Sequence, residues 1–247
     1  MKKFCIVIPS YNNELYCEKN LASVLCQNYS NYRIIYTDDC SSDKTVEKVE
    51  EIISKSTKLK YFTLIKNKER IGAMENLYNM INSCEDDEIA ITVDGDDWMV
   101  GKNILNKLNE IYSNEDIWMT YGQHKRTDNM PYDLSAQYPK DIIATNSFRS
   151  YKWSASHLRT FYSWLFKKLK KEDLMHDGKF YSMTYDLAMM FPMLEMSGSR
   201  SKFIDEVFYV YNRDNVINDN KVSLKTQLNF DKIIRNKPKY QKLNEKI

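Results

Sequence analysis

The sequence predicts an α/β protein with a mostly parallel sheet flanked by helices. Throughout the first half of the chain, short apolar runs alternate with stretches whose apolar residues recur at helical spacing. Strands that alternate with helices are typical of parallel, doubly wound sheets, in which ligands bind beyond the carboxyl ends of the strands. Three of the apolar runs end directly in polar or acidic residues. The sequence therefore predicts a ligand site at one edge of the sheet.

The composition is that of a soluble globular protein. The 247 residues are 43% hydrophobic and 28% charged, with a formal net charge of +2, so the chain can bury a full core without help. The balanced charge gives no support for binding to nucleic acid, and no apolar segment approaches the roughly 18 residues of a membrane span. We expect a cytoplasmic protein, either free or held by other proteins at the cytosolic face of a membrane. The five cysteines lack a Cys-x-x-Cys spacing and are expected to be reduced and mostly buried.

The elements of the first half follow in chain order from the apolar pattern. Residues 4–8 form a continuous apolar run that stops at Pro9, as expected for a buried strand that opens into a loop. A second run, 33–37, ends at Asp38 and Asp39. The same reasoning predicts strands at 61–65, 88–93 and 117–121, and helices at 15–28, about 46–53, 73–81 and 104–112.

The strand at 88–93 ends in the most distinctive stretch of the chain. Three carboxylates, Asp94, Asp96 and Asp97, follow it closely and are separated only by Gly95. Carboxylates this close repel one another unless a cation or hydrogen-bond donors balance them. The stretch therefore indicates a divalent metal site, and the alternative is an acidic turn that caps the next helix.

The second half departs from this alternation. Residues 123–147 are polar and are expected to form loops and short strands. Residues 148–171 are dense in aromatic and basic side chains, which we expect to pack in the core, with a few lining a sugar or acceptor cleft. Stacking against single-stranded nucleic acid is the alternative for this segment.

The last elements are a helix, a strand and a weaker helix. The helix at 184–196 carries Asp186 in its first turn, near the positive end of the helix dipole, and Pro192 should kink it. A strand is expected at 202–212 and a helix at 222–236, and the basic tail that follows from Lys237 is expected to be frayed.

Ordered motifs lie at the predicted strand ends and beyond them. In the first half they are Ile6-Val7-Ile8-Pro9-Ser10-Tyr11-Asn12, Asp38-Asp39-x-Ser41-x-Asp43-x-Thr45, Asn67 with Gly72, and Val93-Asp94-Gly95-Asp96-Asp97. In the second half they are the block 153–161, Tyr185-Asp186-Leu187 and Tyr209-Val210-Tyr211-Asn212. With these motifs the chain resembles glycosyltransferase family 2, of the Rossmann-like GT-A fold, over about residues 4–212.

The resemblance implies transfer of a sugar from a nucleotide-sugar, UDP-linked in our interpretation, to a hydroxyl of a glycan or other acceptor. It implies inversion at the anomeric carbon and a divalent metal, Mn or Mg. Tyr11 would lie against the base, and Asp39 would accept a hydrogen bond from a pyrimidine N–H. The remaining residues of the nucleotide-sugar site would be Pro9, Ser10, Asn12, Arg70, Gly72, Asp94 and Gly95.

The resemblance also assigns the metal and the base. Asp96 would be the main metal ligand, supported by Asp94, and hard carboxylate oxygens suit Mg or Mn. Asp186 matches the general base, which would remove the proton of the acceptor hydroxyl. A further set, Trp153, His157 and Arg159, would contact the acceptor or the diphosphate. For His157, contact with the metal and a purely structural role also stay open.

Three positions depart from the family pattern. Cys40 stands where a glycine is usual, so the loop must differ locally if that site needs a positive φ. Tyr185 stands where an acidic residue commonly precedes the base. The loop after Gly72 lacks a common arginine, so diphosphate contacts are expected from Arg70, Arg159 or the tail.

The predicted organisation is one GT-A domain followed by a short C-terminal part. Residues 1–122 would be the nucleotide-sugar-binding half, 123–221 the half that binds the acceptor and carries the base, and 222–247 a C-terminal helix with a basic tail. Two alternatives to a transferase stay open. One is a catalytically inactive module that binds a nucleotide-sugar, and the other is a phosphohydrolase that uses Asp94 and Asp96.

Overall fold

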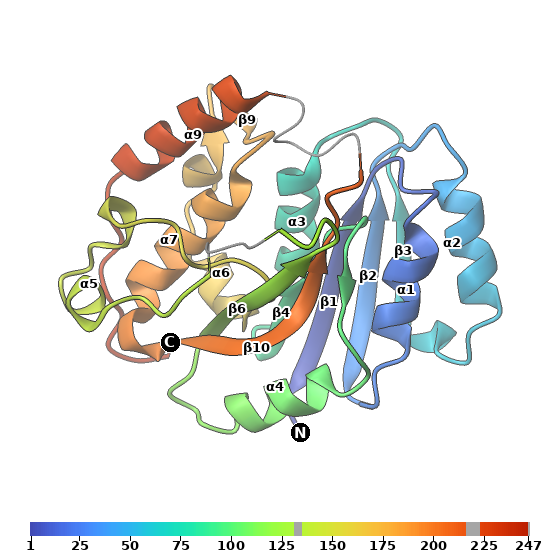
Figure 1. Cartoon of the computed structure of the whole chain (residues 1–247), viewed down its shortest axis with the longest axis horizontal. Helices are drawn as coiled ribbons and strands as arrows, with labels where there is room; N and C mark the ends of the chain where they lie inside the picture. Colours follow the sequence, from blue (N-terminus) through green and yellow to red (C-terminus); the bar gives the residue numbers. More distant parts are fainter. Residues whose placement is uncertain (131–134, 216–222, 247) are drawn as a thin grey trace.

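An eight-stranded sheet runs through the centre of the computed structural model, which describes residues 1–130, 135–215 and 223–246 (Figure 1). The strand order is β3-β2-β1-β4-β7-β6-β10-β5, and β8 and β9 form a separate antiparallel pair. The strands are β1 (Lys3–Ser10), β2 (Tyr32–Asp38), β3 (Phe62–Lys66), β4 (Glu88–Thr92), β5 (Trp98–Met99), β6 (Met119–Arg126), β7 (Arg159–Tyr162), β8 (Met175–His176), β9 (Lys179–Phe180) and β10 (Ser201–Tyr211).

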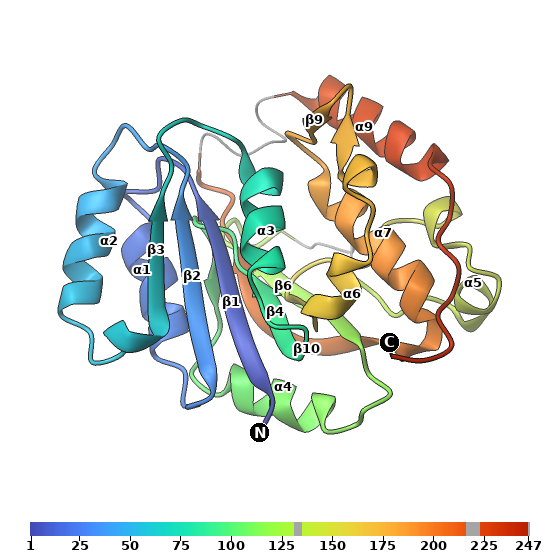
Figure 2. The ribbon, with the colours of Figure 1, turned by 180° about the vertical axis from the view of Figure 1, so that it is seen from behind.

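Helices cover both faces of the parallel part of the sheet. Helix α1 lies on the face nearer the viewer in Figure 1, and α3 lies on the face nearer the viewer in Figure 2. Strand β1 pairs in parallel with β2 and β4 and is buried from Phe4 to Ile8, which explains its unbroken apolar run. The helices are α1 (Cys17–Leu25), α2 (Thr45–Ser54), α3 (Ala73–Asn82), α4 (Ile104–Tyr112), α5 (Lys140–Ala144), α6 (Ser163–Lys167), α7 (Tyr185–Ser197) and α9 (Leu224–Asn236).

The predicted α/β fold with a mostly parallel sheet is confirmed, and the structure adds strands that the sequence did not reveal: β5 and β7 in the large sheet, and the pair β8 and β9. Strand β7 lies antiparallel between β4 and β6, with Ala90 and Met119 both opposite Phe161. It has only four residues and lies in the aromatic segment, so no alternation of polar and apolar residues marks it. Through β7, the second half of the chain continues the sheet of the first half.

The segment 123–147 contains more regular structure than expected. Strand β6 begins two residues later than predicted and continues to Arg126, because it pairs in parallel with β10 over most of its length. Helix α5 follows at Lys140–Ala144. Most aromatic side chains of 148–171 pack in the core as expected; Phe148, Phe161 and Phe166 are buried. Residues 131–134 lie outside the described residues.

The prediction of a frayed tail is wrong for residues 237–246. The Tyr240 N–H donates to the Glu195 carboxylate at 2.9 Å, and its hydroxyl donates to Asp173 at 2.7 Å. The Leu243 N–H donates to the Met196 carbonyl at 2.9 Å. The tail is therefore fixed along α7, because its backbone satisfies a buried carboxylate.

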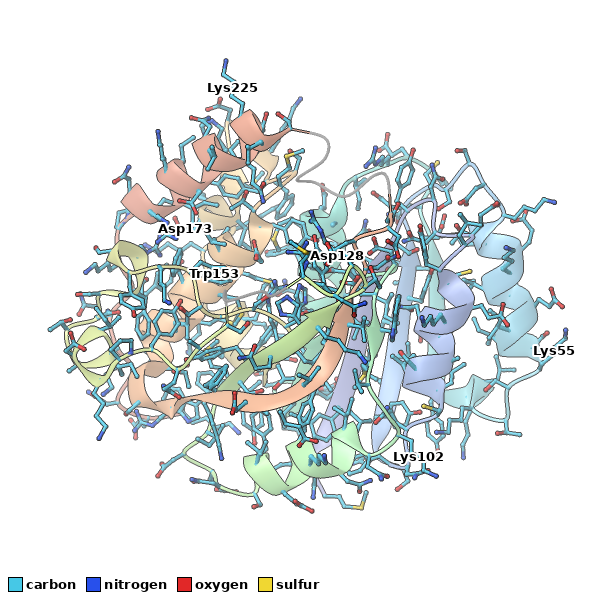
Figure 3. The ribbon with its side chains drawn as sticks, viewed as in Figure 1. Lys55, Lys102, Asp128, Trp153, Asp173 and Lys225 are labelled. Atoms are coloured by element: carbon cyan, nitrogen blue, oxygen red, sulfur yellow. The ribbon has the colours of Figure 1, made fainter. Side chains whose placement is uncertain are left out.

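Two expectations about the whole chain can be compared with the described residues. All five cysteines are free, and three of them are buried. No helix in the described ranges combines the length and the apolar character needed to cross a bilayer. Charged side chains such as Lys55, Lys102 and Lys225 project outward at the periphery (Figure 3).

Candidate functional site

The carboxylate of Asp39 organises the loop that follows β3. It is 3% exposed, and it accepts hydrogen bonds from the N–H groups of Ile71 and Gly72 at 3.0 and 2.8 Å and from the Asn67 amide at 2.9 Å. Burial alone would raise the pKa of Asp39, but the backbone and side-chain hydrogen bonds outweigh it and lower the pKa below its ordinary value. Gly72 has a φ of +93°, which only glycine adopts readily. Asp39 thus fixes the 67–72 loop at the end of β2.

Cys40 keeps the backbone conformation that a glycine would have at this position. Its φ is +63°, in the left-handed region that most residues avoid. The departure from the family pattern therefore changes the side chain and leaves the positive φ in place.

A first cavity, of about 180 Å³, opens where β1 and β4 end. Of the predicted nucleotide-sugar residues, it is lined by Pro9, Tyr11, Arg70, Asp94 and Gly95, together with the predicted metal ligand Asp96. The Arg70 guanidinium lies 3.9 Å from the centre of the Tyr11 ring. A β-carbon at Gly95 would come within 2.6 Å of the Asn13 amide, so only glycine fits there.

Two residues predicted to bind the nucleotide-sugar, Ser10 and Asn12, do not line the cavity. Their hydrogen bonds stabilise the chain at the end of β1. The Ser10 hydroxyl accepts hydrogen bonds from Asn13 at 3.0 Å and from Tyr36 at 2.7 Å. The Asn12 N–H donates to the Ser41 hydroxyl at 2.9 Å. Both residues hold the end of β1 against the loop after β2.

The three carboxylates after β4 have three different environments. Asp97 is fully buried and accepts hydrogen bonds from the Tyr209 hydroxyl and the Asn212 N–H, both at 2.7 Å. Burial, with help from Asp96 and Asp94, raises the pKa of Asp97 well above its usual range. Asp97 therefore ties the acidic loop to the end of β10.

Asp96 and Asp94 face the first cavity. Asp96 accepts a hydrogen bond from the Asn215 amide at 2.8 Å, and burial raises its pKa. Burial raises the pKa of Asp94 to about 6; Arg159 opposes this rise, and the nearby Asp96 and Asp186 carboxylates add to it. The ionised form of both carboxylates is therefore less favourable than that of a solvated carboxylate. A cation in the cavity would favour the ionised form and lower both pKa values.

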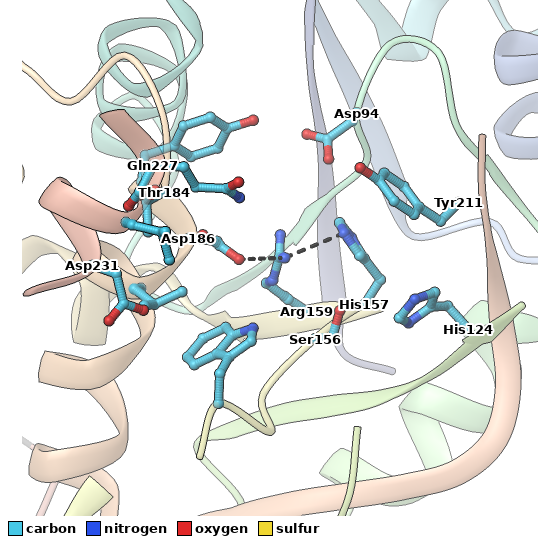
Figure 4. Close-up of a pocket in the computed structure, with 14 residues that line it drawn as sticks. Asp94, His124, Ser156, His157, Arg159, Thr184, Asp186, Tyr211, Gln227 and Asp231 are labelled. Atoms are coloured by element: carbon cyan, nitrogen blue, oxygen red, sulfur yellow. Dashed lines mark hydrogen bonds and ion pairs between the residues drawn. The ribbon is translucent and has the colours of Figure 1, made fainter. Parts of the chain in front are cut away.

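A second, larger cavity of about 390 Å³ adjoins the first (Figure 4). The two share Asp94, Tyr185 and Tyr211 in their walls. Its volume is within the range of about 300–1,000 Å³ typical of small-molecule sites. The predicted residues Trp153, His157, Arg159 and Asp186 all line it.

Arg159 connects the groups at the floor of this cavity. Its guanidinium lies 3.2 Å from the Asp186 carboxylate and 3.2 Å from Nε2 of His157 (Figure 4). Asp186 stands in the first turn of α7, and Arg159 is the first residue of β7. The antiparallel strand that the sequence did not reveal therefore brings the arginine to the predicted base.

Stacking holds the His157 ring in place. Its ring lies parallel to that of Tyr209, with the centres 4.3 Å apart. Burial, with contributions from Arg159 and His124, lowers the pKa of His157 well below its ordinary value. Its Nδ1 has no hydrogen-bond partner among the described residues.

The residues present fit a divalent metal. One ligand atom each of Asp94, Asp97 and His157 lies within 4.8 Å of the others, and oxygen with imidazole donors suits several divalent ions. Asp97 already accepts two hydrogen bonds. Asp96, the predicted main ligand, is not a member of this group; it faces the first cavity together with Asp94.

Several residues that line these cavities were not anticipated as site residues, and the following four are polar groups outside every predicted motif. Gln227 and Asp231 come from α9, Asn215 follows β10, and His124 lies on β6. None of them belongs to a recognisable motif or a predicted strand end. Tyr211 could have been identified from the sequence, because it lies in the Tyr209-Val210-Tyr211-Asn212 motif.

Comparison with known proteins finds glycosyltransferases among the relatives of this chain. The family model described as Glycosyl transferase family 2 matches residues 5–184. The GalNAc(5)-diNAcBac-PP-undecaprenol beta-1,3-glucosyltransferase of Campylobacter jejuni is 24% identical over 217 residues, which are 85% of this chain and 65% of that protein. The chain spans less than two thirds of the length of each curated relative with which it aligns.

Two solved structures share the fold. Residues 1–349 of S. aureus TarS in complex with UDP-GlcNAc align with a TM-score of 0.65 at 19% identity, covering 86% of this chain and 59% of that one. The mannosyltransferase PcManGT from Pyrobaculum calidifontis, in complex with GDP-Man and Mn2+, aligns with a TM-score of 0.58 at 17% identity, covering 94% and 60%. The sheet is thus the predicted GT-A sheet. Because the family model covers residues 5–184, which are most of the sequence, the chain belongs to glycosyltransferase family 2.

Proposed function

We propose that this chain transfers a sugar from a UDP-sugar to an acceptor hydroxyl, with inversion at the anomeric carbon and with Mn or Mg as cofactor. One observation carries the proposal: two cavities meet at Asp94, one reaching the Tyr11 and Arg70 side and the other reaching Asp186. A transferase needs such a pair, because donor and acceptor must meet at one reacting carbon.

In the first cavity the donor would be held by residues of the first half. Asp39 holds the 67–72 loop, which carries Arg70. Asp39 would accept a hydrogen bond from the pyrimidine N–H, and Tyr11 would pack against the base. The Arg70 guanidinium would pair with the diphosphate, whose oxygens match its planar donors. The UDP-bound and GDP-bound relatives support a nucleotide-sugar donor.

The metal would be held by Asp96 with Asp94 in support. The carboxylate oxygens are the ligand type that Mg and Mn prefer, and the relative solved with Mn2+ supports the use of a divalent metal. When bound, the ion supplies positive charge that stabilises the departing diphosphate.

Asp186 would act as the general base. As the acceptor oxygen attacks the anomeric carbon, the bond from that carbon to the diphosphate oxygen breaks, and Asp186 takes the hydroxyl proton. A positioned carboxylate contributes roughly 10²–10⁴-fold to such a step. Arg159, 3.2 Å away, holds the carboxylate in place at the cavity wall.

The test is UDP release from a panel of UDP-sugars, measured with Mn or Mg and after chelation. Asp96→Ala should abolish turnover with the fold intact, and Asp116→Ala, which removes an exposed carboxylate, should leave turnover unchanged. Full turnover in Asp96→Ala would remove the metal assignment. Calorimetric binding of UDP without transfer to any acceptor would favour an inactive binding module.

A further inference from the structure

Helix α9 forms one wall of the larger cavity, although it lies beyond the part of the chain that matches the family model. Gln227, Leu228 and Asp231 of α9 line the cavity opposite Arg159, whereas the family match ends at residue 184. In Figure 4, Gln227 and Asp231 lie on the same side of the cavity as Asp186. This wall is therefore a feature of this chain that the family assignment does not describe.

The wall is held firmly against the segment that carries Trp153. The Arg149 guanidinium forms a buried pair with Glu195 of α7 and donates to the Ile234 carbonyl of α9 at 2.6 Å. In return, Arg235 of α9 donates to the carbonyls of Arg149 and Tyr151, both at 2.8 Å. The distance between α9 and the start of the 153–161 block is thus fixed by buried polar contacts, as a preformed subsite requires.

The side chains on the two sides of this subsite have complementary chemistry. Trp153 is half-buried, and its orientation is set by an edge-to-face contact with Phe191 at 5.3 Å. The Gln227 side-chain amide, which Figure 4 shows extending into the cavity, has no hydrogen-bond partner among the described residues. Asp231 is half-buried and pairs with Arg235 at 2.7 Å, which leaves its other oxygen available.

The negative charge of the cavity wall favours uncharged acceptors over anionic ones. Three carboxylates, Asp94, Asp186 and Asp231, line it, and Arg159 is already paired with one of them. A phosphate group would be repelled at the α9 wall, whereas a neutral hydroxyl can donate to a carboxylate.

We propose that the acceptor is a neutral sugar residue, bound with one ring face on Trp153 and with its hydroxyls bonded to Gln227 and Asp231. The inference rests on the proposed function, since it names the acceptor of that reaction. In this arrangement α9 decides acceptor specificity, and Asp186 receives the proton of the hydroxyl presented to it.

The experiment uses the full chain and two sets of acceptor probes. One set is the methyl glycosides of glucose, galactose, N-acetylglucosamine and N-acetylgalactosamine, and the other is ribitol 5-phosphate and glycerol 3-phosphate. Transfer is measured with the UDP-sugar that the chain hydrolyses fastest. Binding of the same probes is followed by saturation-transfer NMR in the presence of UDP and Mg, which is diamagnetic.

Gln227→Ala should raise the KM for the accepted glycoside about tenfold, the effect of about one lost hydrogen bond. Trp153→Ala should remove the saturation signal of the sugar ring. The matched control is Asn229→Ala, which shortens an exposed amide on the outer side of the same helix and should change neither KM nor binding.

The outcomes separate this inference from the proposed function. Transfer only to the polyol phosphates, or equal KM values for Gln227→Ala and Asn229→Ala, would overturn the sugar subsite while leaving the transferase intact. If no UDP-sugar is turned over, the proposed function fails; glycoside binding that depends on Trp153 and Gln227 would then still support the subsite, and its absence would refute it.

Discussion

The two cavities differ in how their polar groups are held in place. On the donor side, Asp39 is bound by backbone N–H groups of a loop 32 and 33 residues further along the chain. On the acceptor side, side chains of separate elements hold one another: the Arg159 guanidinium of β7 pairs with the Asp186 carboxylate of α7 at 3.2 Å. The first kind of contact leaves a compact motif in the sequence, and the second does not.

The difference suggests separate tasks for the two halves. A donor site built by neighbouring loops can stay similar across a family, because its geometry depends on short segments. An acceptor site built by side chains on β7, α7 and α9 can change when any one of those elements moves or is replaced. We therefore expect substitutions on the two sides to affect different measured quantities.

The largest effect is expected for Asp186→Asn on the acceptor side. The amide keeps the shape of the side chain but cannot take a proton, so transfer should fall by roughly 10²–10⁴-fold. The affinity for UDP, measured by calorimetry, should stay as in the unchanged protein, because Asp186 lines only the larger cavity. Asp177→Asn, at an exposed carboxylate before β9, is the control. Transfer within a few-fold of normal in Asp186→Asn would assign the base to another group.

Smaller effects are expected for Asp39→Asn and Asp94→Asn, which should change the free energy of unfolding in opposite directions. The folded-state pKa of Asp39 is lowered, so its contribution to stability is present above its unfolded pKa of about 3.8 and is lost as the pH falls through the folded value. The folded-state pKa of Asp94 is raised from 3.8 to about 6, so its contribution is present below pH 3.8 and is lost as the pH rises through 6.

These signs can be read from urea unfolding between pH 3 and pH 8 with a chelator present. At pH 8, Asp39→Asn should lower the free energy of unfolding by about 1–3 kcal/mol, because charge-assisted hydrogen bonds are lost. Asp94→Asn should raise it by on the order of 1–3 kcal/mol, and this gain should disappear near pH 4. Destabilisation at pH 8 in both variants would contradict the proposed difference between the two carboxylates.

The smallest effect is expected for Tyr240→Phe in the C-terminal tail. The change removes the hydroxyl that donates to Asp173 and accepts from the Lys170 N–H, and should cost about 1 kcal/mol of unfolding free energy. Tyr61→Phe, directly before β3, is a matched control, since its hydroxyl has no hydrogen-bond partner among the described residues. Equal unfolding midpoints for the two variants would mean that the tail contact contributes nothing to stability.

The sequence by itself determined the parallel half of the sheet and the edge of the sheet at which the first cavity opens. The apolar runs around Ile6, Ile34 and Ile91 identify neighbouring buried strands, and the polar residues at their ends identify one edge of the sheet. These features were readable because each depends on a short segment with a regular period. The acidic loop at Asp94 and Asp96 could also be recognised from the sequence, because its carboxylates lie close together in one short segment.

Only the tertiary structure decided which side chains meet on the acceptor side. Strand β7 brings Arg159 to Asp186, Asp97 turns toward β10, and α9 places Gln227 at the cavity wall. The tail is likewise ordered by the carboxylate of Glu195, 45 residues before Tyr240. None of these contacts has a periodic signal, because each depends on the packing of elements far apart in the chain. The sequence could therefore predict the chemistry of the site, and the fold supplied its geometry.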